Sequence, residues 1–321
     1  MFCKIYPEKV VTLHRIVNNC SVNRLQAAWR NKCLIFGGKV ERFSLFPAKH
    51  CSDIMKVKEI LNALEEFAPL ALQDGYDNAG LQIGLAEDAD ATGALLCLDV
   101  TEDVVDEAIR QGCNLIISHH PLMFHPLKSI SGNDSNGRVI IKAVKKDIAI
   151  YAAHTNLDSA YGGVNFKLAE KLGLKNVKWL VGKGVYQRDG QEMTSGEGLI
   201  GELSAPIDSK DFMERVKETF GIRSLRVNGY EGRTVGRIAL CGGSGAHLIQ
   251  AAMENGADAF LTGEIGYHRF FGYEKKMLLL EMGHYESEQF SLELFAEIVS
   301  KAAPDLPVLC TEVKTNPINY L

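Results

Sequence analysis

Imidazole and carboxylate side chains follow three separate apolar runs of this sequence. Each run is short and rich in Leu, Ile and Ala, a pattern typical of a strand buried in a sheet. The side chains that follow these runs are His119, His120, Asp158, His284 and Glu288. Imidazole and carboxylate ligands without sulfur suit Zn, Fe, Mn, Ni or Co, and not Cu(I). Because three strand ends repeat the same chemistry, the sequence predicts one metal site assembled from distant segments.

The spacing of these five residues is compatible with two metal ions. His119 and His120 are neighbours just before Pro121, so at a strand end they can reach different ions. His284 and Glu288 are four residues apart and would share one face of a helix. Two ions about 3.5–4 Å apart, bridged by a carboxylate such as Glu288, would activate water near neutral pH. We therefore expect a dinuclear site.

Plain structural roles are the alternative for each residue. A His-His pair can occur by chance in a core or on a surface, Asp158 could cap a helix, and Glu288 could be a solvated helix residue. Their coincidence at strand ends favours metal ligands. Three further residues are candidate catalytic groups or contacts to a bound molecule, with a structural role as the alternative: His154, Glu264 and His268.

Alternating strand and helix patterns supply the framework for such a site. Strands are predicted at 93–100, 114–118, 148–153, 235–240, 257–261 and 277–281, and helices at 57–67, 101–112, 137–146, 208–220, 246–255 and 285–299. Short joints between these elements indicate an α/β fold with a mainly parallel sheet. Ligands bind beyond the carboxyl ends of the strands in such sheets, which is where the five residues lie.

Two α/β domains are predicted beyond residue 54. Between about residues 179 and 198, Gly, Gln and Ser replace the apolar periodicity, so we place a domain junction there. The metal-binding α/β domain is expected over residues 55–178 and 276–321, and the second α/β domain over 179–275.

The first 54 residues differ in charge from the rest. They carry nine Lys or Arg and three Asp or Glu, whereas the whole chain has 35 and 40. A clear amphipathic helix begins only after Met55, so we interpret residues 1–54 as an extension that is non-native or disordered. An organelle-targeting peptide and a basic arm for nucleic acid are the alternatives.

The composition excludes several classes of protein. With 321 residues, of which 46% are hydrophobic, the chain can bury one large or two modest cores. No apolar run approaches the roughly 18 residues of a membrane helix, so no membrane association is expected. The net charge of −5 argues against nucleic acid as a partner. Eight cysteines without a Cys-x-x-Cys pair indicate a reducing, cytoplasmic location.

Five motifs occur in order along the body: Asp77-Asn78-Ala79-Gly80-Leu81, Ser118-His119-His120-Pro121, His154-Thr155-Asn156-Leu157-Asp158, Thr262-Gly263-Glu264 with His268, and Gly283-His284-Tyr285-Glu286-Ser287-Glu288. Together they resemble the NIF3-like family, also called DUF34 or the YbgI group. Its members are often labelled GTP cyclohydrolase 1 type 2 homolog or Nif3-like dinuclear metal centre hexameric protein. The resemblance implies two interlocked α/β domains, a dinuclear site built from the same five residues, and a toroidal homohexamer.

The expected function is hydrolysis of a polar small molecule, such as a nucleotide, with the help of two divalent metal ions. The family label suggests opening of the purine ring of GTP, but the ligand set would equally suit phosphoester or amide cleavage. The alternative is a non-catalytic protein that stores, delivers or senses metal, or acts as an interaction scaffold.

Overall fold

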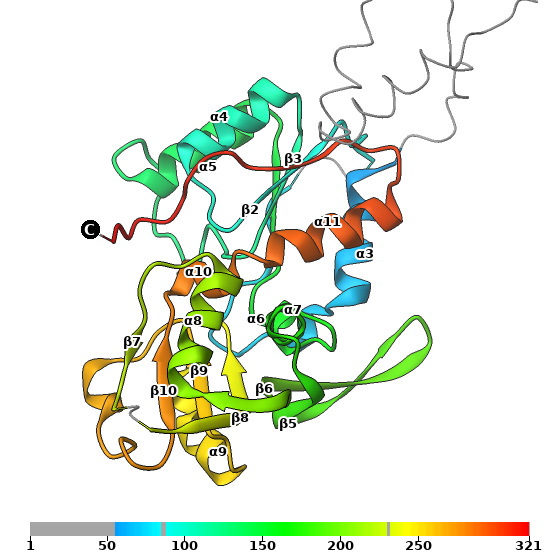
Figure 1. The fold of residues 1–321 in the computed structure, drawn as a ribbon. Coiled ribbons are helices and arrows are strands. Elements are labelled where there is room, and N and C mark those ends of the chain that lie inside the picture. The colour runs from blue at the N-terminus through cyan, green and yellow to red at the C-terminus, as the bar shows by residue number, and fades with distance from the viewer. Residues whose placement is uncertain (1–54, 85–87, 230–231, 321) are drawn as a thin grey trace, which may run out of the picture. The chain divides into compact units, whose positions relative to one another are not determined.

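Two β-sheets with helices on their faces make up the described part of the chain, residues 55–84, 88–229 and 232–320 of a computed structural model (Figure 1). This arrangement confirms the predicted α/β class. Residues 1–54, for which an extension is predicted, lie outside the described residues. Within the described residues, no helix has both the length and the apolar character needed to cross a membrane.

The first sheet carries the first predicted group of strands. Its order is β1 (Gly80–Ile83), β4 (Ala149–Ala152), β3 (Leu115–Ser118), β2 (Ala94–Cys97) and β11 (Val308–Cys310). Strands β4, β3, β2 and β11 are parallel, and β1 pairs with β4 in the antiparallel direction. The parallel strands therefore present their carboxyl ends at one edge of the sheet.

Helices bury both faces of the first sheet, which explains why its strands are apolar throughout. One face, with Leu95, Ile116 and Ile150, packs against α4 (Glu102–Gln111) and α5 (Ser135–Lys145). The other face, with Leu96 and Tyr151, packs against α3 (Val57–Phe67) and α11 (Ser291–Ala302). Helix α4 begins where the sequence predicts, because the Thr101 side chain accepts a hydrogen bond from the Val104 amide.

The second sheet has six strands in the order β5 (Lys175–Arg188), β6 (Gln191–Asp208), β8 (Thr234–Cys241), β9 (Ala259–Thr262), β10 (Leu278–Glu281) and β7 (Arg226–Val227). Strands β8, β9 and β10 are parallel, and the other pairs are antiparallel. Helices α7 (Val164–Leu172) and α8 (Ser209–Phe220) cover one face. The 3-10 helix η2 (Gly245–Leu248) and α9 (Ile249–Glu254) cover the other.

A long β-hairpin occupies the stretch in which the sequence predicts a domain junction. Strands β5 and β6 are antiparallel partners from Lys175 to Glu202, and in Figure 1 their tip extends away from the second sheet. Most side chains near the tip are exposed. A ribbon that is solvated on both sides needs no apolar run, which is why the periodicity fades there.

The two sheets belong to one compact unit. Strand β10 lies in the second sheet, although the predicted boundaries group it with the first, and β11 returns to the first sheet. The division of this unit into two domains stays a prediction. Figure 1 shows the short helix α10 (His284–Glu288) where the chain passes from β10 back towards the first sheet.

Candidate metal centre

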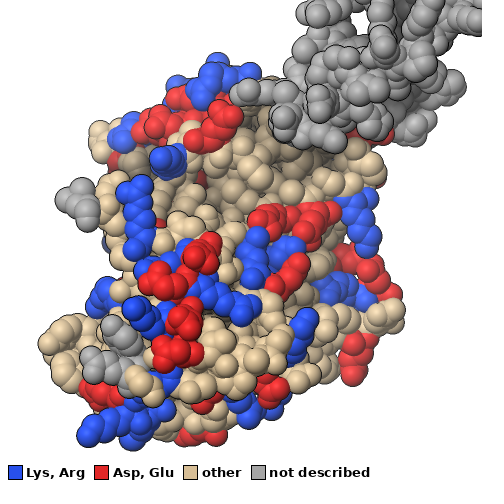
Figure 2. Space-filling model, viewed as in Figure 1, with Lys and Arg blue, Asp and Glu red and all other residues tan. Residues whose placement is uncertain are grey.

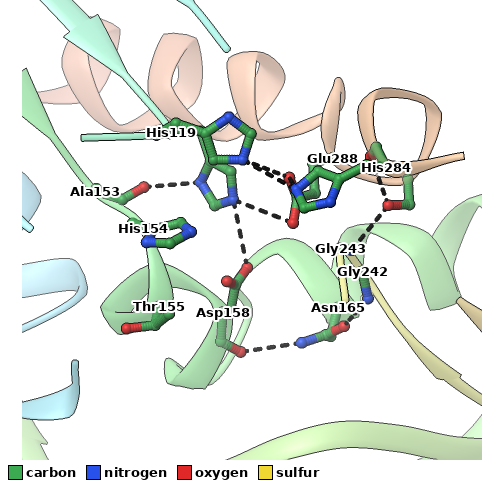
Figure 3. Close-up of polar contacts among 12 residues, drawn as sticks. His119, Ala153, His154, Thr155, Asp158, Asn165, Gly242, Gly243, His284 and Glu288 are labelled. Carbon is green, nitrogen blue, oxygen red and sulfur yellow. Dashed lines mark hydrogen bonds and ion pairs between the residues drawn. The ribbon is translucent and has the colours of Figure 1, made fainter. Parts of the chain in front are cut away.

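His119 and His120 extend the carboxyl end of β3. Their amides donate to the carbonyls of Cys97 and Leu98, at 3.2 and 3.0 Å, so both residues are fixed against the end of β2. The His119 side chain is fully buried, and its Nδ1 donates to the Ala153 carbonyl at 2.8 Å. That bond directs the other ring nitrogen, Nε2, towards the middle of the site (Figure 3).

Asp158 enters from the end of β4, on the short helix α6 (Thr155–Ser159). Two side-chain amides anchor this helix: Asn156 donates to the Ala68 carbonyl at 2.7 Å, and Asn165 donates to the Asp158 carbonyl at 3.2 Å. The Asp158 side chain is therefore held with its carboxylate pointing towards the His119 ring (Figure 3).

His284 and Glu288 lie on one face of α10, as their spacing predicts. Ser287 ties this helix to the turn after β8, because its hydroxyl donates to the His284 carbonyl at 2.7 Å and accepts from the Gly243 amide at 2.9 Å. Gly243 has φ +58°, and a β-carbon there would collide with Glu288 Oε1. The turn thus forms a cradle that only glycine can provide for the Glu288 carboxylate.

All five predicted ligands meet in one cluster. Glu288 Oε2 lies 2.9 Å from His120 Nε2 and 3.0 Å from His284 Nε2. Its second oxygen, Oε1, lies 3.7 Å from His119 Nε2, which is 3.8 Å from Asp158 Oδ1. Two groups of donor atoms, His120–His284–Glu288 and His119–Asp158–Glu288, therefore share the Glu288 carboxylate. A third group, His119–His120–His154, also brings three possible ligand atoms together.

Two buried atoms without a hydrogen-bond partner show that this cluster fits a metal ion. His119 Nε2 and Asp158 Oδ1 are buried and have no hydrogen-bond partner. An unpaired buried polar atom is costly, and a separation of 3.8 Å is too long for a hydrogen bond. Neighbouring ligand atoms of a tetrahedral site with bonds of about 2.1 Å are about 3.4 Å apart, close to the separations seen here.

Carboxylates orient two of the imidazoles from outside the cluster. His120 Nδ1 donates to Asp99 Oδ1 at 2.8 Å, and His284 Nδ1 donates to Glu264 Oε1 at 2.9 Å. Burial lowers the pKa of both histidines, but hydrogen bonds to carboxylates outweigh it, raising the pKa of His120 to about 10 and that of His284 to about 9. Such outer carboxylates are typical of histidines that bind metals.

The pKa values of the two carboxylates in the cluster, the buried Glu288 and the half-buried Asp158, are shifted in opposite directions. Burial opposes ionisation of Glu288, but three neighbouring imidazoles hold its pKa well below the usual value. Burial and the charge of Glu288 raise the pKa of Asp158 well above its usual value. Both directions follow from crowding two carboxylates into one buried site.

The three catalytic candidates lie in different environments. The His154 ring is 5.3 Å from that of His119, and its Nδ1 donates to Asp77 Oδ1 at 2.8 Å. The Glu264 carboxylate accepts from His284 Nδ1, and its amide donates to the Gly243 carbonyl at 2.9 Å. His268 is exposed in the 3-10 helix η3 (Tyr267–Phe270), where its ring contacts are Tyr267 and Phe271. Within the described residues, no contact joins His268 to the five clustered side chains.

Two supporting residues were missed from the sequence. Asp99 holds His120, and its position just past the end of β2, at the same edge as His119, was a usable signal. Asp77 accepts bonds from His154 Nδ1 and from the amide and hydroxyl of Thr155. Burial raises the pKa of Asp77, but these hydrogen bonds prevail and lower it to about 2. Its loop carries no strand or helix pattern, and although Asp77 opens the first of the five motifs, nothing in the sequence assigned it a partner.

Comparisons with known proteins agree with this fold. The model of a family described as Duf34/NIF3 (NGG1p interacting factor 3) matches residues 55–317. A curated relative from Clostridium acetobutylicum, named GTP cyclohydrolase 1 type 2 homolog, is 33% identical over 271 residues, or 83% of this chain and 99% of the relative. The solved structure of a Bacillus cereus protein related to NIF3 has a TM-score of 0.75 at 29% identity, and the match covers 84% of this chain and 100% of that one. A hypothetical protein from Staphylococcus aureus has a TM-score of 0.76 at 31% identity, with the same coverage.

Proposed function

This chain belongs to the Duf34/NIF3 family, and from this premise we propose that it is a divalent-metal-dependent hydrolase with a dinuclear centre. The observation that carries the proposal is the pair of ligand groups that share Glu288. One group takes Glu288 Oε2 and the other lies nearer Oε1, which is how a carboxylate bridges two ions. Zn, Fe, Mn, Ni and Co all suit the donor set.

Bound ions would act as Lewis acids and would lower the pKa of a water molecule between them. The protein's own residues prepare the site for such chemistry. His119, fixed by the Ala153 carbonyl, and His120, fixed by Asp99, keep their Nε2 atoms directed inward. The cradle at Gly243 leaves room for the Glu288 carboxylate beside these two imidazoles.

His154 is the residue placed to move a proton. Asp77 accepts from its Nδ1, which leaves Nε2 as the nitrogen that can exchange a proton with a substrate. Its ring centroid lies 5.3 Å from that of His119 and 5.4 Å from that of His120, so His154 is close to the cluster, and it is not a member of the two groups that share Glu288. We assign His154 the role of general acid or base and Asp77 that of its orienting partner. Glu264 is assigned the role of positioning His284.

The proposed substrate is a polar small molecule of nucleotide type. Curated relatives are named as GTP cyclohydrolase homologues, which is the support for GTP as the first compound to test. Nucleic acid is not proposed as a partner, because acidic and basic side chains are intermixed over the face drawn in Figure 2. A cytoplasmic location and a homohexamer remain part of the proposal and rest on cysteine usage and on the family.

The test is a turnover screen with the full chain. Protein stripped with a chelator is reloaded with Mn, Fe or Zn, and its metal content is measured. GTP and a panel of phosphoesters are then supplied as substrates. We expect turnover of at least one compound, lost by at least a hundredfold in His119→Ala and Glu288→Ala, with about two ions per chain in the wild type.

A second pair of variants separates catalysis from metal storage. His154→Gln should keep the metal content and lose most of the turnover, because His154 is not in the two groups that share Glu288, although it forms a third possible group with His119 and His120. Loss of metal in this variant would make His154 a ligand and contradict its role as a general acid or base. His268→Gln, which changes an exposed histidine without a contact to the cluster, is the matched control and should keep both. Tight metal binding without turnover of any compound would favour the non-catalytic metal-binding function instead.

A further inference from the structure

Two aromatic side chains are exposed beside the metal centre although apolar rings of this size are normally buried. Tyr76 is 66% exposed and Phe124 is 36% exposed. We propose that these two rings form a platform that holds the planar heterocycle of the substrate next to the metal ligands. The proposal rests on the hydrolase function and names the substrate class: a nucleoside or another compound with a flat, nitrogen-containing ring.

A continuous series of ring contacts links this platform to the centre. The Tyr76 and Phe124 centroids are 6.3 Å apart with the planes tilted by 58°. The Phe124 ring meets that of His154 edge to face at 6.0 Å, and the His154 ring lies 5.3 Å from that of His119. A base stacked on one of the two tilted rings would meet the other ring at an angle, and from there its attached groups could extend past Phe124 towards His154 and the ligand cluster.

Hydrogen bonds fix the two segments that carry the rings. The Asn78 side chain donates to the Met123 carbonyl at 2.7 Å, and the Met123 amide donates to Gln82 Oε1 at 3.1 Å. These bonds pin the backbone next to Phe124 to the segment that carries Tyr76. Because both segments are anchored, the platform is organised before a ligand arrives, which lowers the entropy cost of binding.

Polar side chains lie next to the Tyr76 ring and extend towards α6, the helix that carries Asp158. The Tyr76 hydroxyl donates to Asp74 Oδ2 at 3.2 Å, and Lys183 Nζ contacts Asp74 Oδ1 at 2.7 Å. The same ammonium lies 3.5 Å from the hydroxyl of Ser159, the residue after Asp158. A ligand with a flat ring on one side and polar groups on the other matches this surface, whereas an aliphatic ester matches only the polar half.

Binding of the isolated ring tests the platform without requiring turnover. Metal-loaded wild type is titrated with guanosine, adenosine and cytidine, and with ribose 5-phosphate as the probe that lacks a base. We expect the nucleosides to bind, and Phe124→Leu and Tyr76→Leu each to weaken them by about tenfold, the usual effect of removing one stacking ring. Ribose 5-phosphate affinity and metal content should stay unchanged. Ile130→Ala, an exposed apolar residue on the same loop, is the matched control.

The outcomes distinguish this proposal from the hydrolase proposal. Failure of all three nucleosides to bind, or equal affinity in the wild type and both Leu variants, overturns the platform. In that case turnover of a ring-free phosphoester would still support the hydrolase. Nucleoside binding that depends on the two rings, without any turnover, would support the platform and count against the enzyme. A change of oligomeric state in the Leu variants, seen by analytical ultracentrifugation, would make the rings an interface between copies and overturn the platform too.

Discussion

Each histidine of the cluster is oriented through the ring nitrogen that faces away from it. His119 is fixed by a backbone carbonyl, whereas His120 and His284 are fixed by the carboxylates of Asp99 and Glu264. Both kinds of partner fix the orientation of the ring, and the negative charge of a carboxylate makes the imidazole the stronger donor to a metal. The two groups of ligands thus differ in the residues that support them, and Asp99 and Glu264 serve the same group.

Removal of the Asp99 charge should weaken metal binding without unfolding the protein. In Asp99→Asn the shape is kept, but the carboxylate that supports His120 is lost, so we expect metal affinity to fall about tenfold or more. Competition with a chromophoric chelator measures this affinity. Asp103→Asn, an exposed carboxylate in the first turn of α4, is the control and should bind metal like the wild type. Equal affinity in the two variants would contradict a supporting role for Asp99.

Because of Asp77, the free energy of unfolding should depend on pH under acidic conditions. Its pKa is about 2 in the folded chain, against 3.8 for an unperturbed Asp side chain, so the folded state favours the ionised form. The resulting stability is fully present above about pH 4 and is lost as the pH falls through 2. Allowing for solvent near the pair, the contribution is on the order of 1 kcal/mol. Chemical denaturation from pH 2 to 5 should show this loss in the wild type and a flatter profile in Asp77→Asn. Parallel profiles would contradict the assignment.

At the scale of elements, the sequence predicts those strands and helices that have a buried face, because burial requires apolar residues at regular positions. Strands β2, β3 and β4 are buried on both sides, so their apolar runs are continuous and their carboxyl ends can be located. Three of the five proposed ligands, His119, His120 and Asp158, follow those ends, and the other two follow the end of β10, which is also buried. The hairpin of β5 and β6 could not be found in the same way, because most of its tip is solvated. Its turn did carry a local signal: Asp189 and Gly190 have φ of 50° and 71°, as an Asp-Gly hairpin turn requires.

Two His–Glu pairs have the same spacing of four residues, but only one pair shares a helix face. His284 and Glu288 are both in α10, so a separation of four places them on one face. Glu264 and His268 are also four apart, but Glu264 precedes η3, and only His268 lies in that helix. The predicted helix over 285–299 is likewise two helices, α10 and α11. Spacing alone does not reveal where a short helix begins.

The turn after β8 should be intolerant of any side chain at residue 243. In Gly243→Ala the new β-carbon would push the Glu288 carboxylate out of both ligand groups, so we expect loss of metal binding. Gly256→Ala is a matched control, because Gly256 also has a positive φ, +71°, but has open space around it. Both variants should lose about 1–2 kcal/mol of stability from backbone strain. Metal analysis after dialysis should separate them, and retention of metal by Gly243→Ala would contradict the cradle.

At the scale of the whole compact unit, the five proposed ligands come from both sheets. His119, His120 and Asp158 follow strands of the first sheet, and His284 and Glu288 follow β10 of the second. The Glu288 carboxylate reaches across to the first sheet, where it meets His120 Nε2 at 2.9 Å. Ions bound here would therefore link two sheets that are otherwise joined by side-chain packing and by their connecting segments.

Metal removal should for this reason lower the melting temperature of the whole unit in a single transition. A ligand present at a hundred times its dissociation constant stabilises the folded state by about 2.7 kcal/mol. For a unit of this size that corresponds to about 5–10 °C. Differential scanning calorimetry of the full chain, with excess Mn or Zn and then with a chelator, measures the difference. Glu286→Ala, on the same helix, should keep the shift, whereas Glu288→Ala should lose it, because only Glu288 belongs to the ligand groups. An equal shift in both variants would show that the metal acts elsewhere on the chain.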